Sequence, residues 1–520
     1  MVNRWFSTSM LAFPFPILFR TCPICQTIVA LDQLATKAFC CDWIGESEEN
    51  PMELIALSAV EVVARLRRGE ISPLDCLNAL EARIASVNGS VNALVTLCFD
   101  RARDHATALM KKPLGKRGIL AGLPVPIKDL TDVAGVRSTQ GSRIFKDRIA
   151  PASDTLVKHL EAEGGIIYAM SNTPEFGAGA QTFNDVFGIT RNPWNTRLTP
   201  SGSSGGAAVA LATGMAWTAH GSDLGGSLRN PASFCGVVGL RPSPGRVASS
   251  VPGKIDGTLS TEGPMARNVS DVSLMLDAMS GYEAGNPLSL PREAASFQSA
   301  VAAKPVIKRV AVSRDLGITP VDPEVADTIM AAARKLQQAG IIVEEAHPDL
   351  HEAMECFQTL RAAGYAGMHA LLQNHRDLLK PEVIWNIEKG LKLTAVDIAK
   401  AEAQRGTLFH RLHAFLANYD ALLCPATIVP PFPVETRYPT SCNGTNFETY
   451  VDWLLIVAVA TLCACPAISI PCGFTKQGLP VGLQIICPNR REDKLLSVAK
   501  FVEDVLNLGS FTPIDPRFSP

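Results

Sequence analysis

The chain has 520 residues, of which 47% are hydrophobic and 19% are charged, and its formal net charge is −2. This balance is typical of a globular protein with a large core, and the even mixture of charges excludes a nucleic-acid-binding surface. Fourteen cysteines without regular spacing favour a reducing compartment, the cytoplasm, over a disulfide scaffold.

Residues 1–51 differ from the rest of the chain. The apolar run Leu11–Phe19 lies between Arg4 and Arg20 like the core of a signal peptide, but it contains two prolines and no clear cleavage site. The run is also too short to span a membrane, so we predict no membrane partner. We expect residues 1–51 to be a leader or an appended segment outside the fold.

The cysteines of this segment begin like a zinc site. A C-x-x-C pair is followed by two adjacent cysteines, without a histidine at ligand spacing (Cys22, Cys25, Cys40, Cys41). Because zinc ligands usually come in two spaced pairs, we expect no metal here. The chain also lacks H-E-x-x-H, which leaves a metalloprotease without support.

From residue 53 onward, helices and strands alternate. Ser58 precedes one apolar-periodic helix, and Ser72 is the expected N-cap of a second helix over 74–87. The next predicted elements are a strand over 123–127 that ends at Lys128, a helix over 154–163 and a strand over 166–170. The alternation continues to about residue 279, which favours an α/β fold with a central mixed sheet and helices on both faces.

After a polar connection over 281–305, a second α/β run follows. It comprises strands over 308–312 and 341–344, a helix over 323–339, a mainly helical region over 351–417, strands over 421–423, 467–470 and 482–486, and a helix over 493–507. We therefore expect one domain over 52–510, with a first part at about 120–280 and a second at about 305–505.

Two glycine loops carry the chemistry-bearing residues. The loop Gly202–Gly206 opens a helix of small residues over 207–215, and a strand over 217–220 leads to a second loop, Ser222–Ser227. A helix of about 11 residues climbs roughly 16 Å, and about six extended residues return roughly 20 Å, so Ser203 and Ser227 finish on the same side of the sheet. Consecutive N–H groups in the second loop (Leu224, Gly225, Gly226) can form a nest for an oxyanion. The alternative is a pair of ordinary glycine turns.

The first loop also satisfies G-x-S-x-G, with Ser204 at its centre. In α/β-hydrolases this nucleophile elbow follows a strand directly. Residues 191–200 contain two prolines and few strand formers, which is typical of a loop. The Ser–His–Asp alternative therefore lacks its structural context.

A general base is expected at Lys128. Burial at the end of an apolar strand disfavours the charged amine and lowers a lysine pKa toward neutrality. The alternative is a solvated lysine, which is what most lysines at strand ends are.

Together these segments resemble the amidase signature family, in order and in spacing, over about residues 52–505. The matching motifs are PVPIKDL (124–130), SNTPEFG (171–177), GITRNPW (188–194), GSSGG (202–206), GSDLGGSLRNPASFCGVVGLRP (221–242), GPMAR (263–267) and GLPVGLQ (478–484). Two departures, Ser201-Gly202 before the serine pair and Leu224 where threonine is frequent, both concern positions expected to act through the backbone.

The resemblance implies the amidase signature fold and a role for each site residue. Ser227 would be the nucleophile, Ser203 a bridging serine on a cis peptide bond, and Lys128 the base. The N–H groups of Leu224, Gly225, Gly226 and Ser227 would form the oxyanion hole, without a metal or a cofactor. Ser222 and Asp223 would brace the loop or the lysine, or be purely structural, and Arg229 would be scaffold.

Substrate contacts are expected from loops around this core. The residues expected on the acyl side are Gly177, Ala178, Gly179, Ala180 and Gly202. The outer pocket is expected from the 351–460 region. Trp385, Tyr450 and Trp453 suggest an aryl-tolerant site, with core packing as the alternative.

The leading function is a stand-alone hydrolase of small or aryl amides, with esters, anilides and carbamates as side substrates. The alternatives are the glutamine-hydrolysing component of a glutamyl-tRNA amidotransferase, then a fatty amide hydrolase, and outside enzymes a binding or scaffold protein. We expect a monomer or homodimer in the cytoplasm with a small-molecule amide as its partner.

Overall fold

The first helices of the described chain begin at the serine caps that the sequence predicts. A computed structural model describes residues 51–249 and 255–518, so the apolar run Leu11–Phe19 and the cysteines before residue 51 lie outside the described residues. After α2 (Pro51–Ala56), Ser58 and Ser72 each form a capping box, at the start of α3 (Ala59–Arg68) and α4 (Pro73–Val91). Each serine oxygen accepts an N–H group that the first helical turn leaves free.

A small three-stranded sheet carries the predicted base. Its order is β1-β3-β2, with β2 (Pro124–Lys128) parallel to β3 (Ile166–Ser171) and β1 (Leu94–Leu97) antiparallel to β3. The helices α5 (Phe99–Met110) and α6 (Thr155–Ala162) belong to the same part of the chain. Every residue of β2 is buried, and β2 packs on β6 of the larger sheet.

The central sheet has eight strands in the order β10-β9-β11-β15-β14-β7-β8-β6. Its members are β6 (Thr218–Asp223), β7 (Val238–Arg241), β8 (Thr261–Ala266), β9 (Arg309–Val312), β10 (Ile342–Glu345), β11 (Ala421–Pro425), β14 (Ala467–Phe474) and β15 (Pro480–Ile486). The pairs β10–β9 and β9–β11 are parallel and the others are antiparallel, so the mixed sheet is confirmed.

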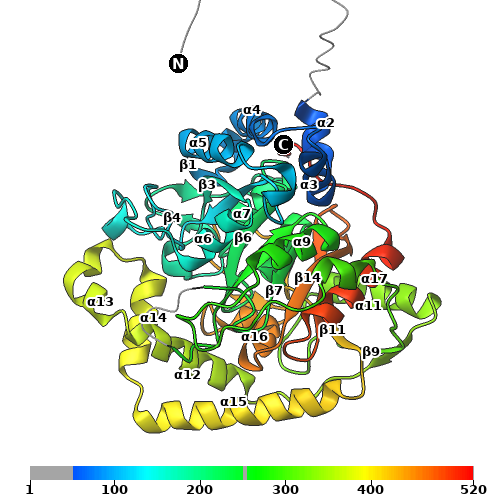
Figure 1. Ribbon diagram of the computed structural model, residues 1–520. Coiled ribbons are helices and arrows are strands. Elements are labelled where there is room, and N and C mark those ends of the chain that lie inside the picture. Colours follow the sequence, from blue (N-terminus) through cyan, green and yellow to red (C-terminus); the bar gives the residue numbers. More distant parts are fainter. Residues whose placement is uncertain (1–50, 250–254, 519–520) are drawn as a thin grey trace, which may run out of the picture. The chain divides into compact units, whose positions relative to one another are not determined.

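Helices cover both faces of this sheet (Figure 1). One group comprises α7 (Gly205–Ala212) and α8 (Arg229–Cys235), and the other comprises α9 (Val269–Met279), α10 (Phe297–Ala302), α11 (Pro323–Gln338) and α17 (Glu492–Leu506). All seven residues of β15 are buried, as expected for a strand that is covered on both sides.

The region 351–417 is mainly helical, as predicted. It contains α12 (Ala353–Ala366), α13 (His369–His375), α14 (Pro381–Leu391) and α15 (Ala395–Leu416), drawn in yellow tones in Figure 1. The helix α12 packs on α14, α15 and α16 (Leu455–Leu462). This helical region thus contacts a helix that lies well beyond it in sequence.

Several boundaries differ from the prediction. The strand expected over 217–220 continues to Asp223, so Ser222 and Asp223 end a strand instead of beginning a loop. The connection over 281–305 contains α10, and α8 and α16 were missed. Both α8 and α16 are short and buried throughout, so neither shows the alternation of an apolar face with a solvent-exposed polar face that makes a helix recognisable in sequence.

The described residues form one compact unit. Residues beyond the predicted boundary at 510 also contact it, since the Ile514 N–H donates to the Ala212 carbonyl and Arg83 donates to the Ile514 carbonyl. Within residues 51–249 and 255–518, no helix is long and apolar enough to cross a bilayer.

Candidate active site

Lys128 ends β2 in a fully buried setting made of neutral oxygen atoms. Its Nζ lies 2.7 Å from Ser203 Oγ, 2.9 Å from Ser204 Oγ and 3.0 Å from Ser222 Oγ. Burial lowers the pKa of Lys128 to about 7, although the more distant Glu262 and Asp223 act in the opposite direction. A large share of these amines is therefore neutral near neutral pH, so the lysine can accept a proton.

His220, on β6, holds the backbone at Lys128. The Lys128 N–H donates to His220 Nδ1 at 3.3 Å, and His220 Nε2 lies 2.7 Å from Glu262 Oε2 on β8. Because Nδ1 accepts a hydrogen bond, Nε2 carries the ring proton and donates a hydrogen bond to the Glu262 carboxylate. The sequence prediction missed this histidine, which lies inside a strand without any motif of its own.

Ser203 is presented by an unusual stretch of backbone. The peptide bond Gly202–Ser203 is cis, as the resemblance implied, and Ser201 before it has a φ of 62°. The neighbouring Ser204, the centre of the G-x-S-x-G pattern, is a direct contact of Lys128, and its N–H donates to the Ser227 carbonyl at 3.1 Å. The two glycine loops are thus joined through their backbones.

Ser203 and Ser227 line one small cavity of about 110 Å³. No hydrogen bond joins their side chains among the described residues, although both line this cavity. Gly177 also lines the cavity, and a Cβ atom there would lie 3.6 Å from Ser203 Oγ. The predicted nucleophile, bridge and base therefore converge at one place.

Three of the four amides predicted for the oxyanion hole are free to bind an oxyanion in the second glycine loop. The Gly226 N–H donates to Asp223 Oδ1 at 2.9 Å, so this amide is not free for an oxyanion. Among the described residues, the N–H groups of Leu224, Gly225 and Ser227 have no acceptor. Gly226 has a φ of 88°, and a Cβ atom there would lie 2.5 Å from Val457 Cγ2, so only glycine fits.

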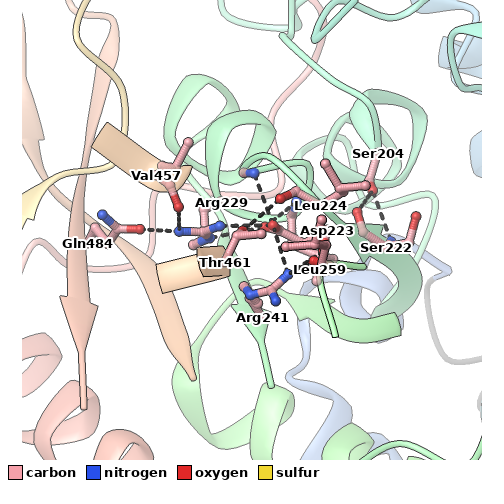
Figure 2. A network of polar contacts seen from close by, with 12 residues as sticks. Ser204, Ser222, Asp223, Leu224, Arg229, Arg241, Leu259, Val457, Thr461 and Gln484 are labelled. Atoms are coloured by element: carbon pink, nitrogen blue, oxygen red, sulfur yellow. Dashed lines mark hydrogen bonds and ion pairs between the residues drawn. The ribbon is translucent and has the colours of Figure 1, made fainter. Parts of the chain in front are cut away.

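Asp223 organises this loop through paired charges (Figure 2). Its carboxylate accepts hydrogen bonds from Arg229 Nε at 3.0 Å and Nη2 at 2.8 Å, while Arg241 donates to its carbonyl oxygen. Burial disfavours the ionised carboxylate, but the two guanidinium groups prevail and hold the pKa of Asp223 below its ordinary value. Asp223 and Arg229 therefore brace the loop, whereas Ser222 contacts the lysine.

Three of the five residues expected on the acyl side line the cavity, namely Gly177, Gly179 and Ala180. Ala178 is buried in a separate apolar cluster with Leu379, Val383 and Ile387. Gly202 is absent from the lining, and a Cβ atom there would lie 3.0 Å from the backbone nitrogen of Gln181. Positive φ values on both sides of Ala178 turn its side chain away from its neighbours, which spacing alone does not predict.

The aromatic residues divide between the pocket and the core. Tyr450 lines the cavity, and Trp385 packs against its ring at 5.5 Å. Trp453 lies in the core against Phe234 and Phe432. The sequence prediction missed Arg361 and Tyr365, which line both this cavity and an adjoining one of about 1150 Å³.

Metal ligands do not converge in the described part of the chain, where no group of three His, Cys, Asp or Glu side chains could hold an ion.

Comparisons with known proteins cover most of the chain. A sequence profile of the family described as Amidase matches residues 75–496. An acylamidase of Rhodococcus erythropolis is 35% identical over 467 residues, covering 88% of this chain and 97% of that protein. The A subunit of the glutamyl-tRNA(Gln) amidotransferase of Halothermothrix orenii is 33% identical over 489 residues, covering 89% and 100%. A crystal structure of a bacterial aryl acylamidase matches with a TM-score of 0.80 at 28% identity, covering 86% of this chain and 96% of that one.

Proposed function

The chain belongs to the amidase signature family of amide-hydrolysing enzymes and has that family's fold, and we propose that it cleaves carboxamides as a stand-alone enzyme through an acyl-enzyme on Ser227. One observation carries the proposal. The buried Lys128 amine lies 2.7 Å from Ser203 Oγ, and Ser203 shares a cavity with Ser227. Membership of this family favours an enzyme over a binding or scaffold protein.

The first half of the reaction forms the acyl-enzyme. Ser227 Oγ attacks the substrate carbonyl carbon, its proton passes to Ser203, and the Ser203 proton passes to neutral Lys128. The amides of Leu224, Gly225 and Ser227 stabilise the charge that develops on the carbonyl oxygen. The C–N bond then breaks, and the proton on Lys128 returns through Ser203 to the leaving nitrogen.

The second half hydrolyses the ester on Ser227. Water enters in place of the leaving amine, its oxygen attacks the ester carbonyl carbon, and its proton passes through Ser203 to Lys128. The tetrahedral intermediate collapses with cleavage of the Ser227 Oγ–C bond, which releases the free acid, and the proton returns from Lys128 through Ser203 to Ser227. The same relay serves both halves because the lysine pKa, about 7, lets it accept and return a proton near neutral pH.

The lining of the cavity supports small or aryl amides as substrates. Phe176, Tyr365, Tyr450 and Leu454 give it an aromatic and aliphatic wall beside Ser227. The similar acylamidase and aryl acylamidase support the same substrate class. We include esters, anilides and carbamates as side substrates because their carbonyl groups form the same type of acyl-enzyme.

Hydrolysis of a panel of amides, anilides, esters and carbamates by the purified chain alone tests this function. We expect product release that is lost in Ser227→Ala. A panel without turnover, or turnover that survives in Ser227→Ala, contradicts the proposal.

A second candidate is the glutamine-hydrolysing component of a glutamyl-tRNA amidotransferase. Arg361 supports it, because this buried guanidinium contacts Tyr450 Oη and Asn386 Oδ1, both neutral, and no carboxylate within the described ranges pairs with it. It could bind the carboxylate of free glutamine. Activity restricted to glutamine and dependent on a partner protein would establish this candidate.

The remaining expectations belong to the same proposal. We propose a cofactor-independent enzyme that acts as a monomer or homodimer in the cytoplasm. Nine cysteines among the described residues, from Cys98 to Cys487, are free thiols, which suits a reducing compartment.

A further inference from the structure

The direction of each peptide group in the second glycine loop decides whether an amide or a carbonyl faces the substrate. In a trans peptide, the C=O of one residue and the N–H of the next point in opposite directions. If the Leu224–Gly225 peptide turned over, a carbonyl oxygen would replace an amide in the oxyanion hole. A loop with consecutive glycines has few steric barriers against this change. Something outside the loop must therefore fix its carbonyls.

Two of the three relevant carbonyls are held by nearby sequence. The Asp223 carbonyl accepts from Arg241, so the Leu224 N–H points away from that guanidinium. The Gly226 carbonyl accepts the Asn230 N–H at 2.7 Å, which directs the Ser227 N–H in the opposite direction. Both donors lie within 18 residues of the carbonyls they hold.

The third carbonyl, that of Leu224, is held from the distant helix α16. Thr461 Oγ1 donates to it at 2.6 Å across 237 positions of sequence (Figure 2). Among the described residues, no other donor reaches this oxygen. The hydroxyl therefore directs the Gly225 N–H toward the opposite side, and Gly225 lines the cavity that holds Ser227.

The acceptor that this hydroxyl would ordinarily use within its own helix is already bound by Arg229. Threonine inside a helix commonly donates to the carbonyl four residues earlier, which here is Val457. That carbonyl accepts Arg229 Nη1 at 2.8 Å, and Arg229 is itself held by Asp223. Thr213, near the end of α7, shows the ordinary alternative, since its hydroxyl donates to Val209 O at 2.7 Å.

We propose that Thr461 is a positioning residue of the oxyanion hole, which holds the Leu224 carbonyl and thereby aims the Gly225 amide at the substrate carbonyl oxygen. This inference rests on the proposed function. It assigns a role in the reaction to a helix that contains none of the catalytic residues.

Three variants test the proposal. Thr461→Val removes the hydroxyl and keeps the shape, Thr461→Ser keeps the hydroxyl, and Thr213→Val removes a buried hydroxyl with no link to the loop. The readouts are kcat and KM for p-nitroacetanilide, the rate at which a fluorophosphonate labels Ser227, and the thermal unfolding midpoint. Labelling forms a Ser227 Oγ–P bond and releases fluoride, the Ser227 proton passes through Ser203 to Lys128, and negative charge develops on the phosphoryl oxygen in the oxyanion hole during the attack.

We expect Thr461→Val to lower kcat and the labelling rate by about tenfold with little change in KM, because it weakens one oxyanion donor without deleting it. Thr461→Ser and Thr213→Val should keep the kcat and labelling rate of the wild type. If Thr461→Val does not fold, Thr461→Ala removes the same hydroxyl with a smaller side chain and should give the same loss.

Each contrary result has a distinct meaning. Wild-type kcat and labelling in folded Thr461→Val or Thr461→Ala overturn the positioning role alone. An equal loss in Thr461→Ser or in Thr213→Val also overturns it, because the effect would then not follow the hydroxyl at this position. A wild-type chain that neither hydrolyses the panel nor labels overturns the proposed function, and the inference with it.

Discussion

Two buried lysines beside the same cavity have different surroundings. Lys128 and Lys380 are both buried, and burial lowers their pKa values to about 7 and about 8. The Lys128 amine meets three serine hydroxyls. The Lys380 amine donates to the Ala178 carbonyl at 3.1 Å, lies over the Phe183 ring and is 3.9 Å from Glu382.

The difference shows that burial alone does not make a lysine a base. A base in a relay needs a neighbour that can give it a proton, and a serine hydroxyl can do so. A backbone carbonyl, an aromatic face and a carboxylate all favour the ammonium form instead. We therefore interpret Lys380 as a cation that anchors the Gly177–Ala180 loop, and Lys128 as the amine that exchanges protons.

The largest expected effect comes from Lys128→Met. Loss of the general base should lower kcat by about 10²–10⁴-fold, because proton transfer then has no acceptor in the buried site. The matched control is Lys380→Met, which removes a second buried amine and should retain most of kcat. Steady-state kinetics on the same anilide decide between them. Equal losses of kcat in the two variants would remove the distinction between the lysines.

The pH dependence of the rate should follow Lys128. Its neutral form is the reactive one, so activity is highest above its pKa of about 7 and falls as pH drops through that value. Well below pH 7, kcat/KM should fall about tenfold per pH unit, because the neutral fraction falls at that rate. The acid limb should keep its position in Lys380→Met. An acid limb that moves by a full unit in this variant would mean that Lys380 contributes to it.

Lys380→Met should act mainly on substrate binding. A hydrogen bond to a charged group contributes about 1.5–3 kcal/mol, so loss of the Ala178 anchor should raise KM by roughly tenfold or more. Lys380→Arg keeps the positive charge and should recover part of this loss. A fall in kcat with KM unchanged would indicate instead that Lys380 takes part in proton transfer.

The smallest effect is expected from Ser204→Ala. It removes one of three hydroxyls around the Lys128 amine, but the relay through Ser203 remains. We expect a loss of unfolding free energy of about 1–3 kcal/mol, because Ser204 Oγ also bonds the Ser222 N–H and carbonyl, and a change in kcat of less than about tenfold. Chemical denaturation and steady-state kinetics measure both. A loss as large as that of Ser203→Ala would make Ser204 a second relay residue.

Much of this protein follows from its amino-acid order alone. Capping serines, apolar periodicity and glycine loops predicted the mixed α/β sheet, many element boundaries and the placement of Ser203 and Ser227 on the same side of it, because these signals act over a few residues. That Lys128 would join these serines was implied only by the resemblance to the amidase signature family. The hydrogen bond from the Gly226 N–H to Asp223 could also have been predicted, since an aspartate side chain often accepts from an N–H two or three residues later. The direction of the Gly177–Ala180 loop was not predicted because Phe176 and Ala180 have positive φ values, which sequence normally predicts only at glycine.

How these groups act depends on contacts that form only in the folded chain. The burial that lowers the Lys128 pKa requires β6 and the GSSGG loop to close over β2, and the contact between Thr461 and Leu224 joins residues 237 positions apart. The helices α8 and α16 have no solvent-exposed face, so no amphipathic pattern in the sequence predicted them. Local sequence limits which conformations are available, whereas a pKa or the direction of a peptide group depends on whichever atoms the fold brings within a few ångströms.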